Sequence, residues 1–178
     1  ERSRSFVVLI LSPEQLSTIS AHAERAYPEE CCGLIVGEII ADSDSRSQKQ
    51  VIRVESLVNK WETETAITEM PAQVTTQSLT KRRRYSIDPK DMLRVQRATR
   101  EAGLQIVGIY HSHPDHAAVP SECDRALAWP EYAYTIVSVC EGKAVDVQNW
   151  ALDSDHQFQP EPIKVLPSAA KDRMPVSA

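Results

Sequence analysis

The sequence predicts an α/β fold in which a mixed β-sheet lies between helices. Short apolar runs typical of strands alternate with two segments whose apolar residues recur at helical spacing, and a helix-start signal precedes each segment. One run, LQIVGIY at 104–110, is apolar enough for a central strand that is buried on both faces. The length of 178 residues and a hydrophobic content of 42% are those of one ordinary globular domain.

The first strand, expected over 6–12, leads directly into a helix. Ser12 has the properties of an N-cap, Pro13 suits the first turn, and Gln15 stands at the capping-box position. Pro28 ends this helix.

The next segment predicts a hairpin followed by an insertion. We expect a buried strand over 31–40, a polar loop over 41–50 and a returning strand over 51–59. Residues 60–84 show weak periodicity and many threonines, so we expect an insertion that is flexible or partly ordered and that carries substrate specificity.

The second half repeats the alternation. A short strand is expected over 85–87, and Asp88 followed by Pro89 then opens a helix that ends at Gly103. After the central strand we expect a helix over 122–129 and strands over 132–140 and 144–152. The predicted domain therefore covers 6–152, and the proline-containing tail 153–178 is expected to be extended or disordered.

Charge and cysteine content exclude several classes of function. A net charge of −5 argues against nucleic acid or an anionic membrane as a partner, and no stretch approaches the ~20 apolar residues of a membrane span. The basic cluster Lys81–Arg84 is local and is expected to be a solvated loop. Four cysteines, two of them adjacent at 31 and 32, do not form a secretory disulfide pattern, and we expect reduced thiols in the cytoplasm.

The most informative stretch is IYHSHPDHAAVPSECD at 109–124, which holds three of the five histidines. His111 and His113 are two residues apart at the end of a strand and therefore point to the same side. If Ser121 caps a helix, Asp124 lies in its first turn, and the seven-residue loop 114–120 can bring it to the same ion. Two imidazoles and one carboxylate predict a catalytic zinc site with an open fourth position, whereas His116 is expected to be an exposed loop residue.

Hydrolysis at such a site needs a base for the attacking water and a donor for the developing oxyanion. Ser121 could donate its hydroxyl to the substrate carbonyl. Spacing alone does not choose the base, because Glu29, Glu30, Glu122 and Asp115 are all eligible.

The segment HSHPDHAAVPSECD has the form H-[ST]-H-x7-S-x2-D. Upstream of it, the segment YPEECCGLIVGE carries a glutamate before a strand of the form G-L-x-x-G. Both elements resemble the JAMM (MPN-domain) zinc metallopeptidases, in the compact bacterial form. The resemblance implies a cytidine-deaminase-like fold, with zinc bound by His111, His113 and Asp124. It also implies that Glu30 is the general base and that Ser121 stabilises the tetrahedral intermediate.

The implied activity is hydrolysis of a peptide or isopeptide bond at the C-terminus of a ubiquitin-like or sulfur-carrier protein. The alternative is a non-catalytic scaffold, since some members of the family lack the ligands. A zinc nucleoside deaminase is rejected, because it needs H-x-E and P-C-x-x-C, and Cys123 has no second cysteine at that distance. Trp129 and Trp150 are expected in the core and Trp61 in contact with a partner, while the sequence leaves the oligomeric state open.

Overall fold

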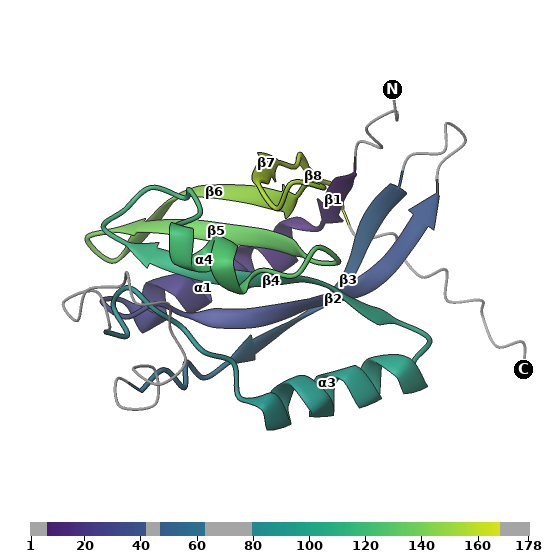
Figure 1. Cartoon of the computed structure of the whole chain (residues 1–178), viewed down its shortest axis with the longest axis horizontal. Helices are drawn as coiled ribbons and strands as arrows, with labels where there is room; N and C mark the ends of the chain where they lie inside the picture. Colours follow the sequence, from purple (N-terminus) through teal and green to yellow (C-terminus); the bar gives the residue numbers. More distant parts are fainter. Residues whose placement is uncertain (1–6, 42–46, 63–79, 168–178) are drawn as a thin grey trace, which may run out of the picture.

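The computed structural model describes residues 7–41, 47–62 and 80–167, and these form an eight-stranded mixed sheet with helices on both faces (Figure 1). The strand order is β7-β6-β5-β4-β2-β3-β1-β8. The strands are β1 (Val8–Leu11), β2 (Cys32–Ala41), β3 (Ser47–Leu57), β4 (Gln105–Pro114), β5 (Ala133–Cys140), β6 (Lys143–Leu152), β7 (Phe158–Pro160) and β8 (Ile163–Val165). The helices are α1 (Pro13–Ala26), α3 (Pro89–Glu101) and α4 (Glu122–Leu127). The predicted α/β class is therefore confirmed.

Strand β4 lies near the middle of the sheet, antiparallel to β2 and parallel to β5. Its residues from Ile106 to Pro114 are all buried, as the apolar run predicts. The strand extends through His111 and His113 rather than ending before them. His111 is therefore paired with both β2 and β5, and His113 with β5.

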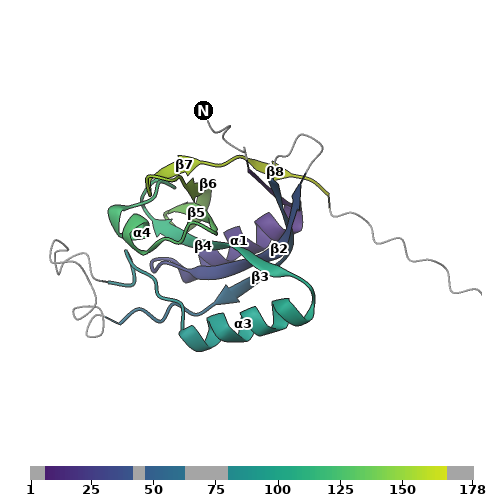
Figure 2. The ribbon, with the colours of Figure 1, turned by 45° about the vertical axis from the view of Figure 1, so that its right-hand side comes forward.

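The two faces of the sheet have separate cores. Cys31 and Ile35 pack with Ile19 of α1, whereas Cys32 and Leu34 belong to the core that α3 covers. Successive residues of β2 thus point to opposite faces, which is the period of a strand. Figures 1 and 2 show α1 and α3 on opposite sides of the sheet.

Both long helices begin as the sequence predicts. Ser12 Oγ accepts a hydrogen bond from Gln15 N at 3.2 Å, and Ser12 N donates to Gln15 Oε1 at 2.8 Å, which completes the capping box. Asp88 caps α3, and Gly103 follows that helix with a φ of +70°. Within the described ranges, no helix has both the length and the apolar character needed to cross a bilayer.

Four local predictions were wrong. Residues 85–87 are not a strand, because the Asn59 side chain rather than a neighbouring strand accepts the Ser86 N–H. Trp129 is 64% exposed instead of lying in the core, whereas Trp61 is buried and not available to a partner. Strand β3 begins at Ser47, within the predicted loop. Of the expected insertion 60–84, residues 63–79 lie outside the described residues.

The sequence predicts no strand beyond Leu152, yet β7 and β8 follow it. Strand β7 pairs with β6 at one edge of the sheet, and β8 pairs with β1 at the other edge. Figure 2 shows this segment crossing between the two edges. Between the two strands, Glu161 N donates to Asn149 O at 2.8 Å, which continues the pairing.

A buried polar group anchors this crossing segment. The Glu161 carboxylate forms an ion pair with Lys49 at 3.1 Å and accepts a hydrogen bond from Asn149 Nδ2 at 2.7 Å. All three side chains are buried. The ion pair therefore joins β3 to the segment between β7 and β8.

We predict that Glu161→Ala lowers the free energy of unfolding by about 3–5 kcal/mol, because it leaves the Lys49 ammonium buried without a counter-charge. The double variant Lys49→Met/Glu161→Leu should lose far less, because no charge remains buried. Urea unfolding of the three proteins measures both effects. Equal losses in the single and double variants would show that the ion pair does not anchor the segment.

Candidate metal centre

The end of β4 presents two imidazoles on one face of the sheet. His111 is fully buried and His113 is 9% exposed. Their Nε2 atoms lie 3.1 Å apart. The intervening Ser112 points the other way and accepts a hydrogen bond from Cys31 N at 2.8 Å, which ties β4 to the residue that follows Glu30.

Helix α4 brings Asp124 to the same place by means of a capping box. Ser121 Oγ accepts from Asp124 N at 3.1 Å, while Ser121 N donates to Asp124 Oδ2 at 2.6 Å. The Ser121 hydroxyl also donates to Asp124 Oδ2 at 2.7 Å. The sequence predicts Ser121 as the N-cap, and this cap fixes the position of the carboxylate.

The three side chains form a donor set suited to a metal ion. The Asp124 carboxylate lies 3.3 Å from His111 Nε2 and 3.6 Å from His113 Nε2, and all three ligand atoms lie within 4.8 Å of one another. Ligands placed tetrahedrally at ~2.0–2.1 Å from zinc are separated by about 3.3–3.4 Å. The observed separations therefore fit a common ion of this size with little movement.

Neighbouring groups orient both imidazoles. His113 Nδ1 lies 2.8 Å from the carbonyl oxygen of Ala117, so in the neutral ring Nδ1 carries the proton that donates to this oxygen and Nε2 keeps the lone pair that a metal needs. The Tyr85 ring stacks on His111 with centroids 4.6 Å apart. Burial lowers the pKa of His111 and thereby favours the neutral imidazole.

Glu30 lies beside the three ligands. Cys32 pairs with His111, and Ser112 N donates to Cys31 O, so extending this register places Glu30 opposite His113. The Glu30 side chain is 5% exposed. Burial and, to a smaller extent, the negative charge of Asp124 raise its pKa to about 8, against the opposing effect of His113. A carboxyl whose pKa lies near neutrality is suited to moving a proton.

The other carboxylates that spacing allowed as bases have different surroundings. Glu29 is exposed. Glu122 forms an exposed ion pair with Arg125 at 2.6 Å. Asp115 accepts hydrogen bonds from the Tyr27 hydroxyl at 3.0 Å and from Glu141 N at 3.1 Å. Only Glu30 among these four carboxylates is buried at the ligands.

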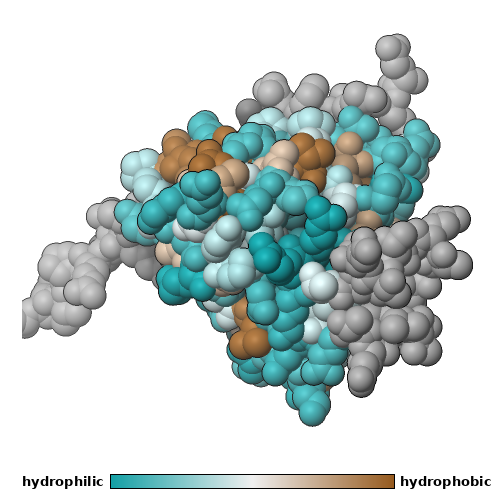
Figure 3. Space-filling model, turned by 90° about the vertical axis from the view of Figure 1, so that its left-hand side faces the viewer, coloured by the Kyte–Doolittle hydropathy of each residue, from teal (hydrophilic) through white to brown (hydrophobic). Residues whose placement is uncertain are grey.

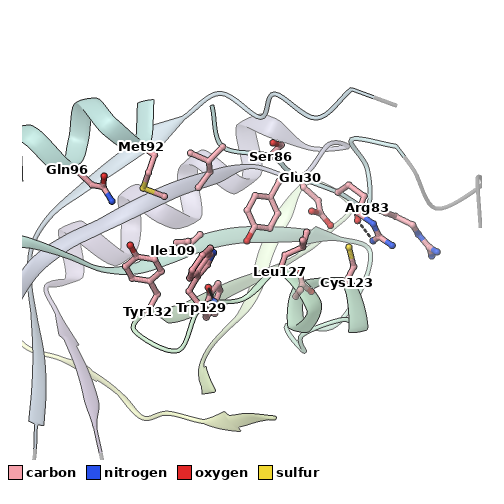
Figure 4. A pocket seen from close by; sticks show the side chains of 15 residues that line it. Glu30, Arg83, Ser86, Met92, Gln96, Ile109, Cys123, Leu127, Trp129 and Tyr132 are labelled. Atoms are coloured by element: carbon pink, nitrogen blue, oxygen red, sulfur yellow. Dashed lines mark hydrogen bonds between the residues drawn. The ribbon is translucent and has the colours of Figure 1, made fainter. Parts of the chain in front are cut away.

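Two cavities meet at Glu30. The larger, of about 540 Å³, is rich in aromatic and apolar side chains and runs from α3 to Asp124. Figure 4 shows Glu30 and Cys123 at one end of it and Gln96 and Tyr132 toward the other. The smaller, of about 210 Å³, lies on the His113 side and is lined by Glu30, Arg82, Arg83, Arg84, His113, Pro114, His116 and Ser121.

Sequence reasoning missed three contributors to this region. Tyr85 covers His111, and Arg84 lines both cavities. The Asn59 side chain donates to the carbonyl oxygens of Glu30 at 3.0 Å and Arg84 at 2.9 Å, and thereby joins the two segments. In the sequence, only the basic run that contains Arg84 drew attention to this region, and its composition is equally typical of a solvated loop.

Residues 12–153 match the family of prokaryotic homologues of the JAB domain. The chain belongs to this family. It is 32% identical over 135 residues to a desampylase from Haloferax volcanii, an alignment that covers 73% of this chain and 80% of that protein. It is also 26% identical over 166 residues to the CysO-cysteine peptidase of Mycobacterium tuberculosis, covering 93% and 96% of the two chains.

Two solved structures of similar proteins have the same fold as this chain. A protein from Desulfitobacterium hafniense superimposes with a TM-score of 0.67 at 29% identity, over 91% of this chain and 95% of its own. A protein from Salinibacter ruber gives a TM-score of 0.59 at 33% identity, over 90% and 92%. The mixed sheet with flanking helices is thus found in relatives along nearly their whole length.

We predict that the purified chain binds one zinc ion, which raises the free energy of unfolding by about 3–4 kcal/mol at 100–1,000 times the dissociation constant. His113→Ala and Asp124→Ala should lose both the ion and the added stability. Elemental analysis and thermal unfolding measure these quantities. The control is His116→Ala, which removes a nearby exposed imidazole. A full equivalent of zinc in His113→Ala would contradict the assignment.

In the metal-free protein we predict that Glu30 makes stability fall as pH rises. The native pKa of about 8 exceeds the ordinary glutamate pKa of 4.5, so between these values the folded state holds a proton that the unfolded state has released. Glu30→Gln should therefore be more stable than the wild type at pH 8, by on the order of 1–4 kcal/mol, and nearly equal to it at pH 5. Urea unfolding with a chelator present measures this.

The matched control for the pH experiment is Glu29→Gln, which neutralises the exposed neighbouring carboxylate. It should show no such dependence on pH. An equal gain for Glu30→Gln at both pH values would mean that burial does not perturb this carboxyl.

Proposed function

We propose that the protein is a zinc-dependent peptidase or isopeptidase that hydrolyses the bond at the C-terminus of a ubiquitin-like or sulfur-carrier protein. The observation that carries this proposal is the convergence of His111, His113 and Asp124 beside a buried Glu30. The relatives named desampylase and CysO-cysteine peptidase support the same class of reaction and substrate.

His111, His113 and Asp124 would hold the ion. Zinc, when bound, is a Lewis acid that polarises a carbonyl and lowers the pKa of coordinated water toward ~7. Glu30 accepts the proton of the attacking water and then delivers it to the leaving amine. Its burial keeps bulk solvent from competing for this proton, and the positive charge of the ion favours the carboxylate form that accepts it.

Ser121 has two roles in this proposal. The backbone N–H and the hydroxyl of Ser121 both donate to the Asp124 carboxylate and hold it in place. Rotation of the hydroxyl from Asp124 toward the substrate carbonyl would let it stabilise the tetrahedral intermediate, which is the role that the family resemblance implies.

The larger cavity suits an extended C-terminal tail. It reaches the site from the side of α3, passing Tyr85, Trp129 and Tyr134, so a peptide entering there meets apolar and aromatic side chains before it reaches Glu30. All four cysteines are free thiols, which is in keeping with our proposal that the protein acts in the cytoplasm. No observation favours the alternative of a non-catalytic scaffold.

We predict that Glu30→Gln retains zinc but lowers kcat by at least about 100-fold, because the amide cannot accept the proton. The assay incubates zinc-loaded protein with small ubiquitin-fold carriers extended past Gly-Gly, and mass spectrometry detects the shortened carrier. Glu29→Gln is the control and should keep wild-type turnover. Near-normal hydrolysis by Glu30→Gln would rule out Glu30 as the base.

A further inference from the structure

The backbone of Glu30 is held by two residues that are distant in the sequence. Glu30 lies two residues before β2, whose pairing with its neighbouring strands begins at Cys32. Glu30 N donates to Lys81 O at 2.7 Å, and Glu30 O accepts from Asn59 Nδ2 at 3.0 Å. Strand β2 therefore brings the candidate base to the site, and these two hydrogen bonds fix both of its peptide groups.

The Asn59 carboxamide uses its full hydrogen-bonding capacity. Its Nδ2 donates to Glu30 O at 3.0 Å and to Arg84 O at 2.9 Å. Its Oδ1 accepts from Trp61 N at 3.0 Å and from Ser86 N at 3.1 Å. Carbonyl oxygens only accept and backbone N–H groups only donate, so the amide fits in one orientation. Among side chains of this length, only asparagine offers both two N–H donors and an accepting oxygen, and because Asn59 is buried, each lost partner is costly.

Polar contacts hold the segment 80–87 at the site. Arg82 and Arg83 are exposed. Figure 3 views the molecule from the side toward which β4 runs in Figure 1, and the surface that it shows is mostly hydrophilic. Burial of apolar surface therefore contributes little to holding the first half of this segment. Its backbone is held instead by hydrogen bonds, from Lys60 N to Ser86 O at 2.9 Å and with the Asn59 side chain.

The same amide also fixes the residue that covers His111. Arg84 and Ser86 flank Tyr85, and the backbone of each binds the Asn59 side chain. The Tyr85 ring between them stacks on His111 with centroids 4.6 Å apart. One side chain thus sets the backbone of the candidate base and the ring over a candidate ligand at a defined distance from each other.

We propose that Asn59 is a positioning residue for the hydrolytic reaction, which holds Glu30 and the segment around Tyr85 where proton transfer requires them. This inference rests on the proposed function. Asn59 lines neither of the two cavities at the site, so it acts through Glu30 and not on the substrate. Glu30 must face both the attacking water and the leaving amine, and a displacement of about 1 Å in such a group can lower the rate about 100-fold.

The test compares Asn59→Ala and Asn59→Asp with wild type in the carrier assay. The aspartate keeps the volume and the accepting oxygen but loses at least one of the two donated hydrogen bonds. Both variants should bind a full equivalent of zinc, because the ligands come from β4 and α4, and should lower kcat by about 10- to 100-fold. Asn149→Ala is the matched control, because it removes an equally buried amide that binds Glu161 and Thr135 instead, and it should keep wild-type kcat.

A double variant separates positioning from a general loss of structure. Glu30→Gln has no base to position, so adding Asn59→Ala to it should lower kcat by less than about 3-fold. Losses that multiply would show that Asn59 does not act through Glu30 and would overturn the proposal. Wild-type kcat in both single variants of Asn59 would overturn it as well.

A second readout depends on neither turnover nor zinc. Amide hydrogen exchange, followed by NMR, should show protection of the Glu30 N–H lowered at least about 10-fold in Asn59→Ala, while the amides of β4 keep theirs. Asn149→Ala should leave the Glu30 N–H protected, and Asn59→Asp serves for this measurement if Asn59→Ala does not fold. Unchanged protection of Glu30 in the Asn59 variant would overturn the proposal. A wild type that cleaves no carrier would instead contradict the proposed function, and the exchange comparison would still decide the role of Asn59.

Discussion

The two-residue period of strand β4 is the constraint on which the site depends. It places the imidazoles of His111 and His113 on one face of the sheet with their Nε2 atoms 3.1 Å apart, and both residues are buried. The Asp124 carboxylate then closes the group from α4. Burying a carboxylate against two nitrogen lone pairs is costly unless a cation or a proton satisfies them, so binding of a cation and folding are expected to reinforce each other.

The surrounding architecture holds this geometry on rigid elements. Pairing with β2 and β5 fixes β4 on both sides, and the same β2 pairing carries Glu30 to the site. The capping box at Ser121 starts helix α4. The same hydrogen bonds also hold the Asp124 carboxylate in position beside the two histidines. The two cavities meet at Glu30, Arg83 and Arg84, and most of the aromatic side chains line the larger one.

Features set by local chemistry could be predicted from the sequence. The caps at Ser12, Asp88 and Ser121 and the alternation through His111 and His113 all depend on residues close together in the chain. The convergence of His111, His113 and Asp124 was predictable for the same reason. The spacing left four carboxylates eligible as the base, and the family resemblance pointed to Glu30; the structure adds that Glu30 alone is buried at the ligands.

Features set by distant contacts could not be predicted. Strands β7 and β8 have three residues each, too few for a periodic signal, and they form because both edges of the sheet are open to pairing. Trp61 and Trp129 exchanged their expected environments because burial of a single aromatic depends on which elements pack over it. The basic run at Arg82–Arg84 has the composition of a solvated loop, and only the fold shows that it lines the cavities beside Glu30.

The most direct test of the central claim is anomalous X-ray diffraction at the zinc absorption edge from crystals of the zinc-loaded protein. A single peak is expected about 2.0–2.2 Å from Nε2 of His111, Nε2 of His113 and a carboxylate oxygen of Asp124. A peak at the cysteines or at His116, or no peak between these three side chains, would contradict it.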